Sequence, residues 1–216
     1  QEGYKVEESQ EKSIIIENLE FKYFGSENSI FKNLNIEIQK NSHTVLTGPN
    51  GSGKSTLLGL ISGLYIPTIG RIKASSSKLG YVGVTPLIIS GSLKENLQYG
   101  NYKEISDEKL INIVTEFKLF SDINEIDLDK DIDSKSLSSG QMQKISFMRA
   151  LLNDVEILLL DESTSNLDKE TKELIFNVLK KENLTIINST HNKDEFDYDY
   201  HLKIEYENEQ RKLTFS

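Results

Sequence analysis

The sequence has no cysteine and only three histidines. Without cysteine the chain forms no disulfide and holds no metal through thiolate ligands. The histidines are widely separated, and we interpret His43 and His201, which have no motif partners, as structural or surface residues. A metal centre built from histidine side chains is therefore not expected.

The sequence also lacks long apolar runs, a signal peptide pattern and an excess of positive charge. No apolar run approaches the ~20 residues that a helix needs to cross a bilayer. The formal net charge of −9 argues against a sequence-independent nucleic-acid binder, because such proteins are normally basic. No repeat and no Pro-rich or Gly/Ser-rich linker divides the 216 residues, which suit one large domain or one domain with lobes.

A phosphate-binding loop of the pattern G-x-x-x-x-G-K-[ST] is present in full. It consists of Gly48, Pro49, Asn50, Gly51, Ser52, Gly53, Lys54, Ser55 and Thr56. Glycines let successive backbone N–H groups point at an anion, Lys54 adds a positive charge, and the Ser55 hydroxyl is a hard ligand for Mg²⁺. An apolar run at 44–46 precedes the loop, and apolar residues at helical spacing follow it, namely Leu57, Leu58, Ile61 and Leu64. A strand, a loop and a helix N-terminus in this order predict a phosphate site.

The rest of the chain predicts an α/β fold whose ligand site lies at the C-terminal ends of parallel strands. Alternating residues predict strands at the N-terminal side, with Leu19, Phe21 and Tyr23 in one, Leu34, Ile36 and Ile38 in the next, and a turn over 25–29. Short strands are also predicted at 71–73, 79–82 and 184–188, mainly helix over 92–153, and a terminal hairpin over 201–215 with its turn at 207–210. The acidic stretch 122–133 misses the calcium-loop pattern, and we interpret it as a solvated loop.

One run, 155–160, is apolar on both faces and ends in Asp161 and Glu162. Such a run is typical of a central parallel strand, because helices cover both sides of the sheet. Two carboxylates at the end of a buried strand are costly unless they have partners. Asp168 is predicted to cap the helix that follows.

Besides the phosphate loop, the chain carries Leu137-Ser138-Ser139-Gly140-Gln141 and the strand that ends at Asp161-Glu162. It also carries Ser165-Asn166-Leu167-Asp168 and, further on, His191. Together these motifs resemble the nucleotide-binding domain of ATP-binding cassette (ABC) transporters of the exporter type, in which they are similar to the LSGGQ signature, the Walker B strand, the D-loop and the switch histidine. The resemblance implies a P-loop NTPase core with a parallel sheet, an N-terminal antiparallel β-subdomain and an inserted α-helical signature subdomain.

The resemblance also implies roles for individual residues, with ATP and Mg²⁺ as cofactors. Tyr23 would stack on adenine, Ser55 and Asp161 would hold Mg²⁺, and Glu162 would act as general base, with His191 and Lys54 at the γ-phosphate. The signature residues Ser138, Ser139, Gly140 and Gln141 would bind the γ-phosphate held by a second subunit, and Asp168 of the D-loop would also be a nucleotide-binding residue. The partner is therefore a second nucleotide-binding domain, in a homodimer or a heterodimer.

A further implied partner is the transmembrane domain of an exporter, which places the chain at the cytoplasmic face of a membrane. Because the chain begins at Gln1 without methionine, residues 1–13 are interpreted as a linker fused to that domain, and 14–216 as the cassette. The helical subdomain is expected at about 92–153. The transported substrate stays open, since specificity would lie in the membrane domain.

The sequence departs from the family pattern at Val84, where a glutamine is expected. Valine neither ligates a hard cation nor donates a hydrogen bond, so we expect normal ATP binding and slower or less tightly coupled hydrolysis. Two alternatives to an exporter ATPase remain open. A regulatory cassette with little turnover is supported by Val84 but opposed by Glu162 and His191. A soluble ABC ATPase acting on DNA or ribosomes would usually show coiled-coil insertions or a second cassette, and neither is visible.

Overall fold

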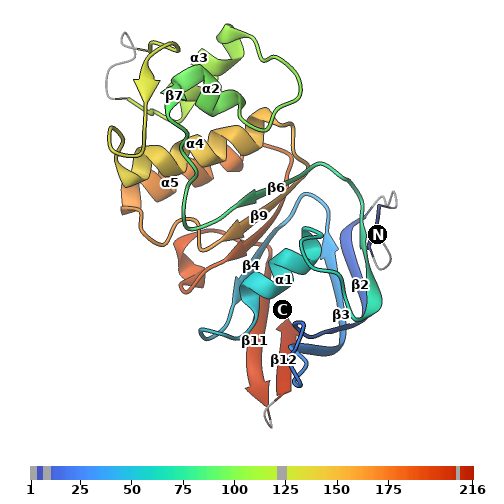
Figure 1. Cartoon of the computed structure of the whole chain (residues 1–216). Coiled ribbons are helices and arrows are strands. Elements are labelled where there is room, and N and C mark those ends of the chain that lie inside the picture. Colours follow the sequence, from blue (N-terminus) through green and yellow to red (C-terminus); the bar gives the residue numbers. More distant parts are fainter. Residues whose placement is uncertain (1–3, 7–10, 121–125, 208–209) are drawn as a thin grey trace. The chain divides into compact units, whose positions relative to one another are not determined.

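The computed structural model describes residues 4–6, 11–120, 126–207 and 210–216. Its strands are β1 (Tyr4–Val6), β2 (Lys12–Phe21), β3 (Phe31–Gln39), β4 (His43–Thr47), β5 (Ile69–Ala74), β6 (Leu79–Val82), β7 (Gly91–Ser92), β8 (Asp131–Ile132), β9 (Ile157–Asp161), β10 (Thr185–Ser189), β11 (Tyr200–Glu207) and β12 (Gln210–Phe215). Its helices are α1 (Lys54–Ile61), α2 (Leu93–Gln98), α3 (Asp107–Glu116), α4 (Ser139–Leu152) and α5 (Lys169–Leu179), with a 3₁₀ turn η2 at Lys193–Glu195 (Figure 1).

The chain divides into two compact units. The first contains the described residues of 1–81, 156–162 and 184–216, and the second those of 82–155 and 163–183. A six-stranded sheet, in the order β12-β11-β4-β10-β9-β6, dominates the first unit. Strand β10 runs parallel to β4 and β9, and β11 runs parallel to β4. The predicted central strand is confirmed, because Leu158, Leu159 and Leu160 of β9 are fully buried.

A four-stranded sheet, in the order β1-β5-β2-β3, also belongs to the first unit. Strand β2 pairs antiparallel with β3 and β5, as expected for an N-terminal β-rich region. One hydrophobic core joins this sheet, α1 and the six-stranded sheet. Helix α1 is buried on all sides, which explains why its apolar residues form no single stripe. Burial of this helix fixes the position of the loop in front of it.

The second unit is mainly helical. Helices α4 and α5 pack side by side (Figure 1), and α5 contributes an apolar face with Ile175, Phe176, Val178 and Leu179 buried. Strands β7 and β8 pair antiparallel at Gly91–Ile132 and Ser92–Asp131. Part of the acidic stretch that we interpreted as a loop is thus a short strand.

Three local predictions need correction. A linker was expected over 1–13, but Tyr4–Val6 form β1, parallel to β5, and β2 begins at Lys12. Tyr23 was placed in a strand, yet β2 ends at Phe21 and a turn follows, with the Ser26 N–H bonded to the Tyr23 carbonyl. Leu64 was placed in the helix, yet α1 ends at Ile61 and Leu64 is 72% exposed. Gly63, with a φ of 75°, is in the left-handed conformation that commonly ends helices.

Other predictions fall partly on residues that are not described. Residues 1–3 and 7–10 of the expected linker, Asp122 and Glu125 of the acidic stretch, and Asn208 and Glu209 of the expected turn lie outside the described residues. The hairpin itself is confirmed, since β11 and β12 pair antiparallel from Leu202–Phe215 onward.

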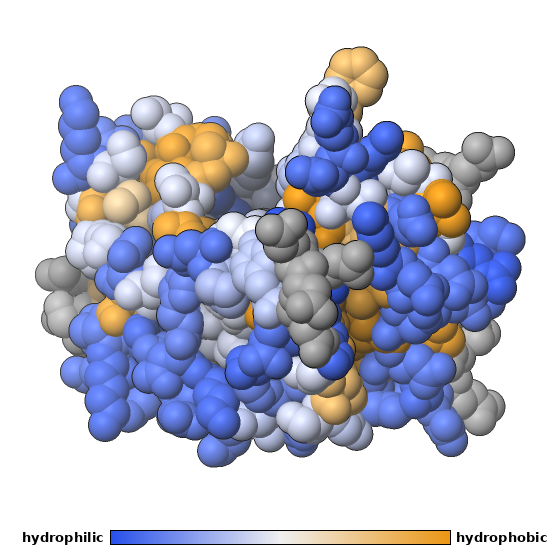
Figure 2. Space-filling model, turned by 90° about the horizontal axis from the view of Figure 1, so that it is seen from below, coloured by the Kyte–Doolittle hydropathy of each residue, from blue (hydrophilic) through white to orange (hydrophobic). Residues whose placement is uncertain are grey.

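The helices are short. In the part of the chain that the structure describes, none combines the length and the apolar character that crossing a membrane requires. Hydrophilic side chains make up most of the face drawn in Figure 2, and hydrophobic side chains form smaller groups among them.

Candidate nucleotide site

The phosphate loop connects β4 to α1 in the first unit, as the sequence predicts. Gly53 precedes α1 with a φ of 106° and a ψ of 15°, in the left-handed region that favours glycine. No side chain caps α1. The first N–H groups of a helix have no partner within the helix, and they carry its positive dipole end. This helix start is therefore built to receive an anion.

Lys54 is buried beneath the loop, with only 5% of its surface exposed. Its Nζ donates to the Gly48 carbonyl oxygen at 3.0 Å and to the Pro49 carbonyl oxygen at 3.4 Å. The Oε1 atom of Glu162 lies 3.6 Å from the same nitrogen. The ammonium group is thus held at the loop by three oxygen atoms.

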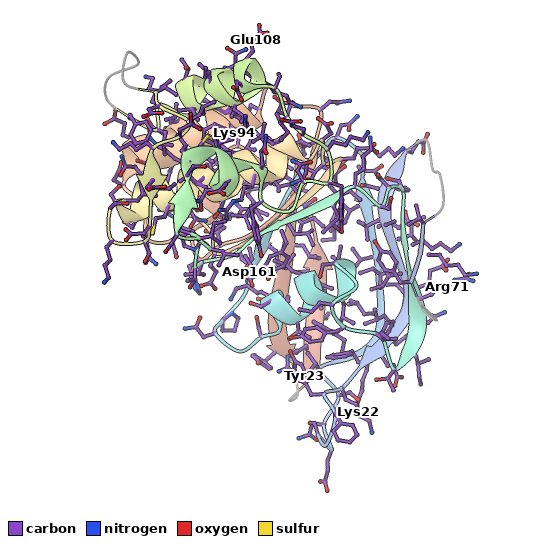
Figure 3. All side chains as sticks on the ribbon, turned by 45° about the horizontal axis from the view of Figure 1, so that its top comes forward. Lys22, Tyr23, Arg71, Lys94, Glu108 and Asp161 are labelled. Atoms are coloured by element: carbon purple, nitrogen blue, oxygen red, sulfur yellow. The ribbon has the colours of Figure 1, made fainter. Side chains whose placement is uncertain are left out.

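Asp161, which Figure 3 labels, ends β9, and both of its carboxylate oxygens accept hydrogen bonds. Ser55 Oγ donates to Oδ1 at 3.0 Å, and the Tyr81 hydroxyl donates to Oδ2 at 2.7 Å. Burial, followed by the hydrogen bond to Asp161, raises the pKa of Tyr81, so this hydroxyl keeps its proton. Ser55 and Asp161, the two residues expected at the metal, therefore lie in contact.

Glu162 follows Asp161 and lies against His191. Its Oε1 is 3.0 Å from His191 Nε2, and its backbone N–H donates to the Ser189 carbonyl at the end of β10. The φ of Glu162 is 51°, a conformation that costs a non-glycine residue on the order of 1–3 kcal/mol and is found often at functional sites. Parallel pairing of β9 with β10 brings the two strand ends, and so these two side chains, together.

Tyr23 lies near α1 rather than in the strand. Its hydroxyl is 2.8 Å from Thr56 Oγ1. Phe21 and Tyr65 contact it edge-on, with ring centroids 5.1 and 5.5 Å from that of Tyr23. The residue is 39% exposed. The aromatic side chain of Tyr23 is thus hydrogen-bonded to Thr56, the last residue of the phosphate loop.

The signature residues lie in the second unit, at the start of α4. Ser138 is the N-cap, and its hydroxyl oxygen accepts from the Gln141 N–H while the Ser138 N–H donates to Gln141 Oε1, which is a complete capping box. Gln141 Nε2 also donates to the Leu119 carbonyl. Ser139 and Gly140 occupy the first turn. These groups order the helix start before any ligand arrives.

Asp168 caps α5, as predicted. Its Oδ1 accepts from the Thr171 N–H and its Oδ2 from the Thr171 hydroxyl, both at 2.8 Å. The backbone hydrogen bond from Thr171, followed by the hydroxyl bond, lowers the pKa of Asp168.

Val84 lies between β6 and β7, in the second unit, and is 42% exposed. Two side chains of α4 anchor the segment around it. Gln143 Nε2 donates to the Gly83 carbonyl at 3.0 Å, and the buried Arg149 guanidinium donates to the carbonyls of Leu87 and Asn96. Burial lowers the pKa of Arg149. The segment is well held although it lacks the glutamine.

The structure brings together five of the predicted residues in the first unit: Lys54, Ser55, Asp161, Glu162 and His191. The signature residues, Asp168 and Val84 belong to the second unit. Sequence reasoning missed Tyr81, although its strand was predicted and lies next to β9 in the sheet order. It also missed Tyr206 and Arg211, which donate to carbonyl groups of the phosphate loop and for which the sequence offers no signal.

The residues present fit a nucleotide phosphate and a magnesium ion. At Gly48 an added Cβ would lie 2.7 Å from the Ile204 carbonyl oxygen and 2.8 Å from Ser52 Oγ, so only glycine lets the loop lie this close to β11. Ser55 and Asp161 offer hard oxygen ligands, and Mg²⁺ takes few protein ligands beside phosphate and water. In the described part of the chain, no group of three or more His, Cys, Asp or Glu side chains forms a metal cage.

Comparison with known proteins gives the same family. The sequence model described as ABC transporter matches residues 31–165. ATP-dependent permease MDL1 of Candida albicans is 36% identical over 186 residues, which are 76% of this chain and 27% of that protein. The Lactococcin transport/processing ATP-binding protein LcnC-like of Lactococcus lactis subsp. lactis (strain IL1403) is 33% identical, covering 78% of this chain and 26% of that protein. The chain thus spans about a quarter of the length of these relatives.

A solved structure supports the fold. The bacterial Atm1-family ABC exporter with ATP bound matches 92% of this chain and 38% of that chain, with a TM-score of 0.80 and 24% identity. The predicted α/β ABC ATPase fold is confirmed by this likeness. The chain therefore belongs to the ABC transporter family, and what it contains is that family's ATP-binding ATPase domain.

Proposed function

We propose that this chain binds MgATP and hydrolyses it to drive export by a transmembrane domain. The observation that carries the proposal is the contact set around Glu162, whose Oε1 is 3.0 Å from His191 and 3.6 Å from Lys54. In this reaction a water molecule attacks the γ-phosphorus, its proton passes to the Glu162 carboxylate, and the bond to ADP breaks. His191 orients Glu162 and the γ-phosphate, and Lys54 binds the phosphate oxygens. Ser55 and Asp161 hold Mg²⁺, which neutralises phosphate charge when bound.

The second half of the site comes, in this proposal, from another nucleotide-binding domain. Ser138, Ser139, Gly140 and Gln141 present a helix start with a hydroxyl and N–H groups, a combination suited to an anion. The phosphate loop of the same chain already has its own helix N-terminus. The signature therefore serves the γ-phosphate on the partner, and Asp168 lies at the same interface. The same chain or a related one fills the partner position.

Tyr23 is proposed to contact the adenine. Its hydroxyl already fixes the ring beside Thr56, and its neighbours contact it edge-on. Its exposed part is available for stacking, which aromatic rings favour in offset or edge geometry.

The membrane partner is proposed from the relatives. One is named a permease and another a transport/processing ATP-binding protein, and this chain spans only part of each. We propose that the chain forms one cassette with its helical subdomain at about 92–153. This cassette works with a transmembrane domain at the cytoplasmic face of the membrane, with no nucleic acid as partner.

Substitution of Glu162 tests this function. Glu162→Gln keeps the size and the hydrogen-bonding capacity but removes the base, so ATP hydrolysis falls about 10²–10⁴-fold while ATP affinity stays unchanged. The variant with ATP forms a dimer on size-exclusion chromatography. Glu156→Gln, at the other end of β9 and paired with Lys78, is the matched control and keeps wild-type turnover. Unchanged hydrolysis in Glu162→Gln would contradict the proposed base.

Val84 is proposed to affect the rate of ATP hydrolysis. We propose that its apolar side chain slows hydrolysis, because a glutamine amide would help to position the metal and the water. Val84→Gln is expected to raise turnover about three- to tenfold, less than the about 10²–10³-fold that a single positioned donor can contribute. Thr85→Gln, on the next exposed residue, is the control. Turnover that stays level or falls in Val84→Gln would remove Val84 as the cause.

A second candidate is a regulatory cassette that binds ATP with little turnover, and Val84 alone favours it. Steady-state turnover of the wild-type dimer distinguishes the two. A rate that Glu162→Gln cannot lower further would favour the regulatory reading.

A further inference from the structure

The terminal hairpin, β11 and β12, lies against the back of the phosphate loop. At the start of the loop, a Cβ added to Gly48 would be 2.7 Å from the Ile204 carbonyl oxygen and 3.2 Å from Ile204 Cβ. The loop backbone and the β11 backbone are therefore in direct contact. The hairpin follows the loop by about 150 residues in the chain, so no local pattern connects the two.

Two side chains of the hairpin donate to the middle of the loop. The Tyr206 hydroxyl donates to the Gly51 carbonyl at 3.0 Å. Arg211 donates to the Ser52 carbonyl through Nε at 2.7 Å and to the Gly51 carbonyl through Nη2 at 3.1 Å. The two consecutive carbonyl groups thus receive three hydrogen bonds, two of them from a charged donor.

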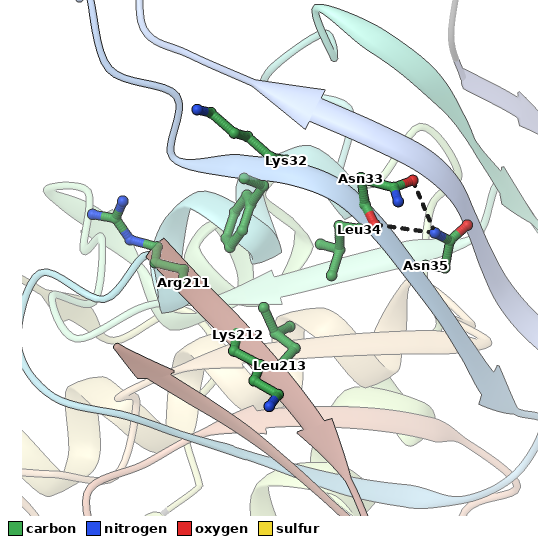
Figure 4. Close-up of a pocket in the computed structure, with 8 residues that line it drawn as sticks. Lys32, Asn33, Leu34, Asn35, Arg211, Lys212 and Leu213 are labelled. Atoms are coloured by element: carbon green, nitrogen blue, oxygen red, sulfur yellow. Dashed lines mark hydrogen bonds between the residues drawn. The ribbon is translucent and has the colours of Figure 1, made fainter. Parts of the chain in front are cut away.

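Arg211 is itself held in place. Its Nη1 donates to the Ile30 carbonyl at 3.4 Å, and its guanidinium carbon is 5.3 Å from the centre of the Tyr206 ring. Arg211 also lines one end of a groove of about 270 Å³ between β3 and β12. Figure 4 shows that its guanidinium points away from Leu213, out of the strand. Because the guanidinium group is planar and its N–H donors have a fixed arrangement, Arg211 loses little rotamer freedom when it binds two carbonyl groups.

Hydrogen bonds to the carbonyl groups of Gly51 and Ser52 set the direction in which the N–H groups of the same peptides point. In a planar trans peptide the C=O and the N–H point in opposite directions. When Arg211 holds the Ser52 carbonyl toward the hairpin, the Gly53 N–H points to the other side of that peptide. The Gly51 carbonyl is likewise fixed, and the Ser52 N–H of the same peptide donates to the Pro49 carbonyl at 3.1 Å, which closes the turn. Hydrogen bonds to a carbonyl also polarise the peptide and strengthen its N–H as a donor.

We propose that Arg211 and Tyr206 are positioning residues for the nucleotide phosphates: from the terminal hairpin they hold the turn of the phosphate loop closed and keep the Gly53 N–H turned away from the hairpin, toward the anion. Neither residue touches the nucleotide. The inference rests on the proposed function only in naming ATP as the anion. A purely structural hairpin would stabilise the domain without setting phosphate affinity.

Nucleotide titration and amide exchange test this inference in the 216-residue chain. The variants are Arg211→Gln and Tyr206→Phe, the second of which removes only a hydroxyl and keeps the ring. Charge-assisted hydrogen bonds are stronger than neutral ones, so the Kd for fluorescent ATP and ADP rises about tenfold in Arg211→Gln and about threefold in Tyr206→Phe. Hydrogen–deuterium exchange accelerates at residues 51–54 in both, without nucleotide, and Arg211→Lys restores part of the affinity.

Matched controls separate positioning from general loss of order. Lys212→Gln removes the same charge from the next residue of β12, and Tyr200→Phe makes the same change elsewhere on β11; both keep wild-type Kd and exchange. Equal Kd and equal exchange in Arg211→Gln and Tyr206→Phe would overturn the inference. So would exchange that accelerates across the whole first unit, since this is the mark of a structural role.

Failure of the proposed function gives a different result. A wild-type chain that binds neither ATP nor ADP refutes the nucleotide assignment. Exchange at residues 51–54 in the same variants, measured without nucleotide, still decides whether the hairpin holds the loop.

Discussion

Helices α1 and α4 both begin at a motif that we propose to bind phosphate, yet they begin in different ways. Gly53 precedes α1 in the left-handed conformation, and no side chain caps the helix. Ser138 precedes α4 in an extended conformation, and a capping box with Gln141 is complete. The first helix leaves its leading N–H groups for a ligand, whereas the second satisfies part of its own.

This difference in capping means that the two helix N-termini are stabilised in different ways. An uncapped helix N-terminus is unfavourable alone, and α1 is held by burial and by contacts from other segments. It can therefore be ready to bind phosphate within one chain. The signature helix is stable without a ligand, and its capping hydroxyl still has a proton to donate. This division suits a site in which one chain binds the nucleotide first and the partner closes over it.

Removal of the Lys54 charge is the most severe test of the first helix start. Lys54→Ala takes away a buried cation that contacts the loop, so the Kd for ATP rises on the order of 100-fold. Titration of the monomer with fluorescent ATP measures it. Lys78→Ala, which breaks an exposed ion pair with Glu156, is the control. A loss below about threefold would mean that the loop backbone alone holds the phosphates.

The capping box is the corresponding test of the second helix start. Ser138→Ala removes the cap and lowers the free energy of unfolding by about 1 kcal/mol, because the Gln141 N–H loses its partner. ATP binding by the monomer stays within twofold of wild type. Urea unfolding and ATP titration measure the two effects, with Ser139→Ala on the next residue as control. A parallel loss of monomer ATP affinity would contradict the division between the two helices.

Substitution of Asp168, at the start of α5, is expected to change stability the least, and the size of that change depends on pH. The pKa of Asp168 is lowered in the folded chain, so its charged form stabilises the fold above the ordinary value of 3.8. That contribution is lost as pH falls through the lower folded pKa. Asp168→Asn is therefore less stable than wild type at pH 7, and the difference shrinks below pH 3.8. Urea unfolding at several pH values measures it, and a constant difference would exclude the charge as the cause.

Local patterns in the sequence predicted much of the fold. The strand, loop and helix around Lys54, the central strand ending at Asp161, the cap at Asp168 and the terminal hairpin are all confirmed. Each follows from neighbours a few residues apart, through periodicity, turn chemistry or a capping bond. Tyr23 was misplaced because alternation continues to it in the sequence, although the chain turns after Phe21.

The features of the site that the sequence did not predict depend on contacts between residues far apart in the chain. Tyr81 meets Asp161 across 80 residues, and the left-handed Glu162 depends on a bond to the end of β10. No periodicity or spacing encodes such pairs. Sheet order decides them, because it places β6 and β10 on either side of β9.

Residue type and local spacing are enough to predict the chemistry of the phosphate loop: its glycines, its lysine and its serine hydroxyl, together with the strand and the helix on either side. Those properties are local, since they depend on residue type and on bonds between near neighbours. The contacts that hold the loop, by contrast, come from long-range packing. Its carbonyl groups meet Tyr206 and Arg211 from the other end of the chain, and such contacts exist only after the two sheets have packed around α1.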